Sequence, residues 1–257
     1  MKYLRIVTVA VCLISVQHLY SQGTLDDVHP FQSFFRDAAI SDAPYIEGMF
    51  GFSNYDNLNV LNIGARGTYH FNSQFGIGAS LAFLNFDPDV GDGESGISDL
   101  RVVGLYHFPT RTSVKISAGG FIVLPIGSED LGQEEGNFGV FGAVRYPVTP
   151  GTVVIGSLSL DFLEGIPVEG GGWPVLFVGG DRETVLRFGG GVIHEITNEV
   201  SVVGELNFTT EGEFGLLTGG VDYALRNGGR VRGSLGVGLD DGAPDVSLIV
   251  TFLQAFR

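Results

Sequence analysis

Residues 97–127 read ISDLRVVGLYHFPTRTSVKISAGGFIVLPIG and predict one membrane-crossing β-hairpin. Alternate residues of a strand face opposite sides. On the first arm, one face carries Leu100, Val102, Gly104, Tyr106 and Phe108, and the other carries Asp99, Arg101, Val103, Leu105 and His107. The second arm repeats this alternation after a turn that contains Pro109. Arms of roughly ten residues exceed an ordinary globular strand and match a tilted strand that crosses a bilayer.

The N-terminus is typical of an export signal. Lys2 and Arg5 precede an apolar run at residues 6–16, which is too short for a spanning helix of roughly 20 residues. We therefore expect residues 1–21 to be a signal peptide that is removed. The only cysteine, Cys12, lies inside it, and Val11 before it is not the small residue of a lipoprotein signal. The mature chain then has no thiol for disulfides or metal binding.

The charge balance excludes one class of partner. Removing Lys2 and Arg5 takes two positive charges from a formal net charge of −15 and leaves −17. Nucleic-acid binding needs a basic face, so we expect no nucleic-acid partner. The acidic stretch at residues 87–94 lacks the Glu at the twelfth position of an EF-hand loop, and we interpret it as a solvated loop.

The alternation recurs along the chain and predicts an all-β fold, a transmembrane antiparallel β-barrel of twelve strands that spans residues 44–257. The expected strands are 44–53, 58–71, 74–86, 97–109, 112–125, 137–147, 152–163, 184–196, 200–209, 214–225, 230–239 and 245–256. Short connections alternate with the longer ones at 87–96, 126–136 and 164–183. Outer-membrane barrels have short periplasmic turns and longer external loops, so this alternation predicts the cell outer membrane and the orientation.

Two segments do not fit the strand pattern. The apolar run WPVLFV at residues 173–178 would make an odd thirteenth strand, so we place residues 164–183 in one long external loop. Residues 22–43 are either a periplasmic tail or a small plug in the lumen. We favour the tail because chain termini are usually loosely held.

Aromatic residues and the last strand support the membrane assignment. Phe71, Phe75, Tyr106, Phe108, Tyr146, Tyr223 and Phe256 all lie beside short connections, as in an interfacial girdle. The strand at 245–256 resembles the C-terminal strand by which the barrel assembly machinery recognises outer-membrane proteins, although the chain ends on Arg257. We expect outer-membrane lipid and that machinery as partners.

Charged residues fall on the inward face of the predicted strands, because an Arg or Lys on the lipid face costs about 2–4 kcal/mol at the midplane. The candidate pore-lining residues are Arg66, Asp99, Arg101, Lys115, Arg145, Asp161, Arg187, Glu205, Asp222 and Arg232. These charges could line a water-filled passage or pair with one another and close the barrel. A twelve-stranded barrel is intermediate between filled and open sizes, and we favour the passage. Asp99, Arg101, Lys115, Arg145 and Arg187 are our candidates for selectivity.

The sequence predicts no enzyme and no cofactor. His194 is adjacent to Glu195, but neighbouring strand residues face opposite sides of a wall. GxSxG and HExxH motifs are absent from the sequence. We expect no Ser or Thr hydroxyl within reach of an interface histidine. His29, His70 and His107 are widely separated along the chain, so we expect interface or lumen residues rather than ligands.

Three short motifs resemble a known family. Ser98-Asp99-Leu100-Arg101, Leu105-Tyr106-His107-Phe108 and Leu124-Pro125-Ile126-Gly127 are similar to the pattern of the outer-membrane barrel family labelled putative MetA-pathway of phenol degradation. Ile126 stands where that family usually has Thr, and His107 where Arg is common. The resemblance implies an outer-membrane channel or importer for aromatic or other small hydrophobic compounds.

We therefore predict a monomeric or loosely associated barrel that serves as a passive, porin-like channel for a small-molecule solute. The alternative is a closed structural or adhesive barrel that acts through the external loops at 87–96, 126–136 and 164–183. A lipid-modifying barrel enzyme is a third, weaker hypothesis.

Overall fold

The structure is a computed structural model that describes residues 25–39, 43–128, 136–170, 173–226 and 228–256, with the backbone alone for residues 165–181. The expected signal peptide at residues 1–21 lies outside these ranges. In the described part of the chain, no helix is long and apolar enough to cross a membrane. One short 3-10 helix, η2 (Leu25–Asp27), precedes the strands.

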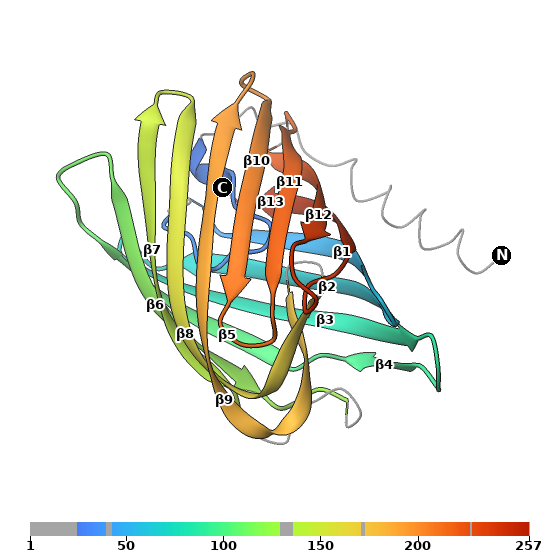
Figure 1. Cartoon of the computed structure of the whole chain (residues 1–257). Helices are drawn as coiled ribbons and strands as arrows, with labels where there is room; N and C mark the ends of the chain where they lie inside the picture. Colours follow the sequence, from blue (N-terminus) through green and yellow to red (C-terminus); the bar gives the residue numbers. More distant parts are fainter. Residues whose placement is uncertain (1–24, 40–42, 129–135, 171–172, 227, 257) are drawn as a thin grey trace.

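The alternating segments form antiparallel strands that close into a barrel (Figure 1). The strands are β1 (Tyr45–Tyr55), β2 (Leu58–His70), β3 (Phe75–Pro88), β4 (Glu94–Ile97), β5 (Leu100–Phe108), β6 (Lys115–Leu124), β7 (Phe138–Thr149), β8 (Thr152–Gly170), β9 (Trp173–Glu195), β10 (Val200–Thr209), β11 (Gly215–Ala224), β12 (Gly229–Gly238) and β13 (Val246–Ala255). Each strand pairs with its sequence neighbour, except that β4 and β5 both pair with β3, and β1 pairs with β13 to close the ring.

The wall has twelve strands although thirteen segments are extended, because β4 and β5 share one place. The short β4 pairs with the far end of β3, at Phe83–Phe86, and β5 pairs with the near end of the same strand. Ser98 and Asp99 interrupt this composite strand. The prediction of an all-β, twelve-stranded antiparallel barrel is confirmed.

The external connections are more ordered than the sequence predicts. The prediction of a single loop at residues 164–183 is wrong, because β8 continues to Gly170 and β9 begins at Trp173. The run at 173–178 pairs with the end of β8 in an extended hairpin and adds no membrane crossing. This hairpin curls across the lower opening in Figure 1, and β8 also contacts β1 and β2, which are not its neighbours in the sheet. Part of the predicted 87–96 loop is likewise strand, in β3 and β4.

Burial follows the predicted alternation along the strands. On β5, Val103, Leu105 and His107 are buried inside, whereas Phe108 is exposed to the outside. The predicted girdle also lies outside: Phe71, Phe75, Phe108, Tyr146, Tyr223 and Phe256 are exposed, and Tyr106 is half-buried. An apolar outer surface is what a lipid environment requires, so the closed barrel indicates the outer membrane.

The segment before the first strand lies inside the barrel rather than beyond it. Residues 25–39 appear in blue within the ring of strands (Figure 1). Phe31, Phe34 and Ala38 of this segment are buried, and so are its polar residues His29 and Asp37. The preferred prediction of a periplasmic tail is therefore wrong for residues 25–39. The loosely held terminus that we assumed does not apply, because side chains from the barrel wall bind this segment along its length.

Candidate functional site

A charged network joins neighbouring strands on the inner face of the wall. Glu47 on β1 accepts hydrogen bonds from Arg66 Nε and Arg232 Nη1, both at 2.6 Å. Asp222 on β11 pairs with Arg230 and Arg232, at 2.6 and 2.9 Å. All five side chains are almost completely buried. A buried charge is tolerated only when it is paired and hydrogen-bonded, and here each one is.

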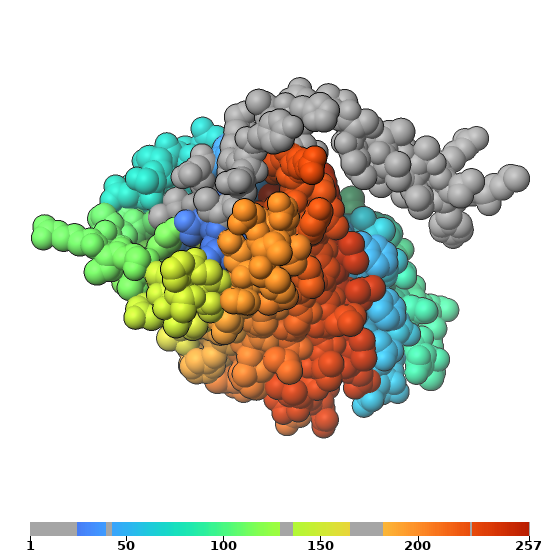
Figure 2. Space-filling model, turned by 90° about the horizontal axis from the view of Figure 1, so that it is seen from above, coloured from blue at the N-terminus to red at the C-terminus, as the bar shows by residue number. Residues whose placement is uncertain are grey.

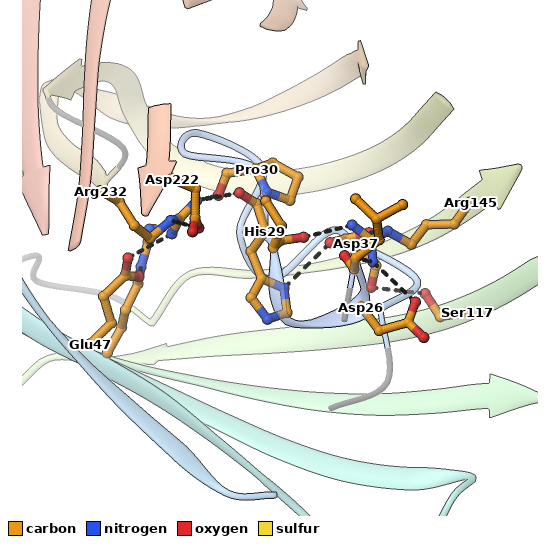
Figure 3. Close-up of polar contacts among 12 residues, drawn as sticks. Asp26, His29, Pro30, Asp37, Glu47, Ser117, Arg145, Asp222 and Arg232 are labelled. Atoms are coloured by element: carbon orange, nitrogen blue, oxygen red, sulfur yellow. Dashed lines mark hydrogen bonds and ion pairs between the residues drawn. The ribbon is translucent and has the colours of Figure 1, made fainter. Parts of the chain in front are cut away.

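Residues 25–39 fill the space beside this network, and Arg145 on β7 binds them most extensively. Its Nη2 donates to the carbonyl of Val28 at 2.6 Å, and its Nε lies 3.0 Å from Asp37 Oδ1 (Figure 3). The neighbouring Lys115 Nζ lies 2.5 Å from Asp26 Oδ2. Two cations of the wall thus bind both ends of the segment.

Strands β10 and β12, further round the barrel, hold the middle of the segment. Glu205 on β10 accepts a hydrogen bond from the Gln32 amide at 2.8 Å, and Ser33 donates to Asn207 Oδ1 at 2.7 Å. Arg232 donates to the carbonyl of His29 (Figure 3). These contacts come from strands far from Arg145, so the segment spans the lumen from wall to wall.

Aromatic rings of the segment lie under the wall arginines. The Arg66 guanidinium lies 3.6 Å from the centre of the Phe34 ring, and that of Arg232 lies 4.4 Å from the Phe31 ring. Cation–π contacts of this kind become stronger when both groups are removed from water. Seen from the end with the short turns, blue atoms of the segment occupy part of the opening between the strands (Figure 2).

A second charged cluster lies where the segment meets β5, β8 and β9. Asp161 on β8 accepts a hydrogen bond from Arg187 Nε at 2.7 Å, and Arg36 of the segment lies 3.9 Å from the same carboxylate oxygen. Arg101 on β5 lies 3.7 Å above the Phe121 ring and interacts electrostatically with Arg36, Arg187 and Asp161. This cluster contains three cations and Asp161, and Glu205 on β10 also interacts electrostatically with Arg36.

The structure places the ten candidate pore-lining residues on the inner side of the wall, with one qualification. Asp99 lies in the break between β4 and β5, where its Oδ1 accepts a hydrogen bond from the Gly127 amide at 2.8 Å. The other nine join the two charged networks or bind the segment: Arg66, Arg101, Lys115, Arg145, Asp161, Arg187, Glu205, Asp222 and Arg232. Their part in passage or selectivity stays a prediction.

One of the two predictions about histidines is wrong. His70 and His107 lie inside the barrel, as expected of lumen residues, and their ring centroids are 5.4 Å apart because β3 brings β2 and β5 together. On the outer side, Thr152 Oγ1 lies 3.0 Å from His194 Nδ1, although we expected no such hydroxyl. The adjacent Glu195 faces the other side and does not complete a triad. Within the described ranges, no three His, Cys, Asp or Glu residues gather as a metal site.

Sequence reasoning missed the functional residues of the segment itself. His29, Arg36 and Asp37 lie among buried aromatic residues, and His29 Nδ1 is 3.4 Å from Asp37 Oδ2. The available signal was composition, since residues 30–39 (PFQSFFRDAA) combine three phenylalanines with an Arg-Asp pair. Such a mixture suits a segment that packs inside a charged lumen better than a solvated tail.

Comparisons with known proteins give the fold and no family. No family model matches the chain, and no curated protein is significantly similar. Among solved structures, an outer-membrane channel from Pseudomonas putida F1 matches with a TM-score of 0.69 at 12% identity, covering 90% of this chain and 100% of the other. The KdgM porin in complex with disordered oligogalacturonate matches at 0.55 and 13% identity, covering 83% and 99%. The Ralstonia pickettii toluene transporter TbuX matches at 0.51 and 12% identity, covering 86% and 91%.

The chain has the fold of outer-membrane channel barrels. At these identities the likeness extends to the fold alone, so the family resemblance of the three short motifs stays a prediction.

Proposed function

We propose that this protein is an outer-membrane channel through which small molecules pass passively, and that residues 25–39 close it in the conformation described here. The observation that carries the proposal is that a separate terminal segment fills the bore. Arg145, Glu205 and Arg232 of the wall bind it, and the strands continue around it without a break in pairing. Removing the segment would therefore leave the wall intact.

The size of the barrel supports this interpretation. Eight strands enclose a space that wall side chains can fill, whereas sixteen enclose an aqueous channel. Twelve strands enclose more than their own side chains fill, and here fifteen residues occupy the excess. Displacement of a terminal segment is a smaller rearrangement than repacking a wall, so it is the simplest route to an open state.

We propose aromatic or other small hydrophobic compounds as candidate solutes, following the motif resemblance and the toluene transporter among the structures of similar fold. The apolar outer face suits lipid, and the last strand suits recognition by the barrel assembly machinery. Neither role needs the segment to move.

The second candidate is a closed barrel with a structural or adhesive role. The observation that favours it is the extended β8–β9 hairpin, which curls across the external opening (Figure 1). An enzyme remains the weakest hypothesis, since Thr152 and His194 lack a third group in the described structure.

The decisive experiment compares the full chain with a deletion of residues 25–39 that keeps the preceding residues. Both proteins are purified in detergent, checked for heat-modifiable migration and incorporated into planar bilayers. We expect the deletion to conduct in larger and longer steps than the full chain. A folded deletion variant that conducts no more than the full chain would favour the closed barrel.

A further inference from the structure

The arginine cluster around Asp161 brings three arginines close to two described carboxylates, Asp161 and Glu205, and Glu205 also interacts with Arg66 and Arg232. Arg187 and Arg36 both use the Oδ2 atom of Asp161, at 2.7 and 3.9 Å. Arg101 has no carboxylate within ion-pair distance among the described side chains, and its Nε is buried without a hydrogen-bond partner. An unsatisfied buried cationic donor is costly, and an incoming anion would relieve that cost.

An apolar surface adjoins the same cluster. Phe121 lies directly under Arg101, and Val103, Leu105, Phe141, Leu163 and Val185 form one buried cluster with it. Phe35 of the N-terminal segment and Val123 pack against this cluster. The charged groups and the apolar surface are therefore continuous, and both come from strands β5 to β9 and from the N-terminal segment.

Glycines in the wall bring these groups together. A Cβ at Gly139 would lie 2.5 Å from the Phe121 ring and 2.6 Å from Asp161 Oδ1. A Cβ at Gly119 would lie 2.4 Å from the Phe141 ring. The two rings thus lie over strand residues that have no side chains, and the Phe121 ring lies next to the Asp161 carboxylate.

The cluster is partly exposed at one end. Arg101 and Val123 face each other across β5 and β6 and are only half-buried, whereas Val103 and Phe121, the next inward pair, are buried. Arg101 therefore stands at the exposed edge of the apolar cluster.

We propose that Arg101, Arg36 and Arg187, with Phe121 and its apolar neighbours, bind a small amphipathic carboxylate: an aromatic or short aliphatic acid. The carboxylate takes the charge-assisted hydrogen bonds that Arg101 lacks, and the apolar body lies against Phe121 and Val123. The inference rests on the proposed channel function and specifies its substrate class. Planar guanidinium groups suit a carboxylate geometrically, which favours an acid over an uncharged aromatic compound.

The test measures equilibrium binding of benzoate to the full protein in detergent by calorimetry, with benzyl alcohol and acetate as companions. Benzyl alcohol lacks the charge, and acetate lacks the apolar body. We expect each companion to bind about tenfold more weakly than benzoate, and Arg101→Gln to weaken benzoate binding by about tenfold or more. Arg111→Gln, which changes an exposed arginine in the β5–β6 turn, is the matched control and leaves binding unchanged.

Two results would overturn the inference. In the first, the Arg101→Gln variant binds benzoate as tightly as the unmodified protein does. In the second, benzoate binds to the unmodified protein no more tightly than benzyl alcohol or acetate. Heat-modifiable migration verifies that each variant is folded. The bilayer experiment separates this failure from that of the channel function. If the deletion variant conducts but the full protein does not bind benzoate, only the acid site is refuted. If the full protein binds benzoate but the deletion variant never conducts, only the channel function is refuted.

Discussion

Arg145 on β7 and Asp37 of the N-terminal segment form an ion pair inside the barrel, with Nε 3.0 Å from Oδ1 and both side chains almost fully buried. The pair joins a membrane-spanning strand to the element that fills the bore. Arg145 also donates to the carbonyls of Val28 and Leu25, at 2.6 and 3.3 Å. Its Nη1 also lies 3.6 Å from Asp26 Oδ1. One wall residue thus contacts four residues of the segment, and its replacement should weaken closure more than any other single change.

Arg145→Met should increase channel opening. The substitution keeps an unbranched side chain but leaves Asp37 buried without its main partner, and breaking a buried pair costs about 3–5 kcal/mol. Single-channel recording should show more frequent openings than in the unmodified protein. Arg111→Met serves as the control because Arg111 is exposed in a turn. Equal opening frequencies in the two variants would show that Arg145 does not hold the segment closed.

Closure should also depend on pH through Asp37. Burial acts to raise the pKa of this carboxyl, but Arg145, and more weakly His29, hold the pKa below its ordinary value. Because the pKa is lowered in the docked segment, the Asp37 carboxylate stabilises docking fully at a pH above its ordinary pKa of about 3.9. This stabilisation is lost as the pH falls through the lower pKa that Asp37 has in the docked segment. Conductance should stay constant near neutrality and rise only below about pH 4.

Asp37→Asn mimics the protonated carboxyl and should open the channel at neutral pH. The control is Asp56→Asn, since Asp56 is exposed in the β1–β2 turn. Histidine side chains titrate between about pH 7 and 5. A conductance that already rises in this range would therefore indicate that a histidine, and not Asp37, controls closure.

Glu47→Gln should destabilise the wall itself. The Glu47 carboxylate pairs with Arg66 and Arg232, with an N–O distance of 2.6 Å in each pair. The uncharged amide of Gln would leave these two buried guanidinium groups without the anion that they share. We expect a loss of about 3–5 kcal/mol in the free energy of unfolding, measured with urea in lipid vesicles. Glu199→Gln in the exposed β9–β10 turn should change stability by less than about 0.5 kcal/mol. A similar, small effect for both would mean that the network is not stabilising.

Gly139→Ala should destabilise the barrel, whereas Gly142→Ala on the same strand should not. The new methyl group at position 139 would meet the Phe121 ring and Asp161 at 2.6 Å or less, but at position 142 its nearest neighbour is 3.9 Å away. Overpacking of this kind costs about 1–3 kcal/mol. The midpoints of urea unfolding give the comparison, and equal midpoints would contradict the packing of Phe121 over Gly139.

The wall could be predicted from sequence because membrane strands repeat one simple rule. The alternation at Val103, Leu105 and His107 against Phe108 is imposed by lipid outside and polar groups inside, so parity alone assigns the face. The β8–β9 hairpin escaped prediction for the same reason. Beyond the membrane, no lipid imposes alternation, and Pro174 suggested a loop although it lies in β9 opposite Glu169.

The lumen was predictable in composition but not in pairing. Parity placed Arg145 and Asp161 inside, yet it could not show that Arg145 binds Asp37 or that Asp161 binds Arg187. The Asp161–Arg187 pair depends on the register of β8 and β9, and the partner of Arg145 depends on where the N-terminal segment lies, which has no periodicity to place it. Its position depends on contacts with strands that occur much later in the sequence, such as the hydrogen bond from Ser33 to Asn207.

A reversible cross-link between the segment and the wall tests the central claim most directly. A Cβ at Gly189 would lie 2.9 Å from Ser33 Oγ, which suits a disulfide, and Ser157→Gly removes the hydroxyl that would crowd it at 2.5 Å. Asn207 Oδ1, at 2.9 Å, is the end of a flexible side chain and has to turn aside. We would record single-channel current from the triple variant Ser33→Cys, Ser157→Gly, Gly189→Cys before and after reduction. The account predicts no openings in the oxidised protein and openings after reduction, with no such change in Ser33→Cys alone. Equal current in the oxidised and reduced protein would contradict closure by residues 25–39.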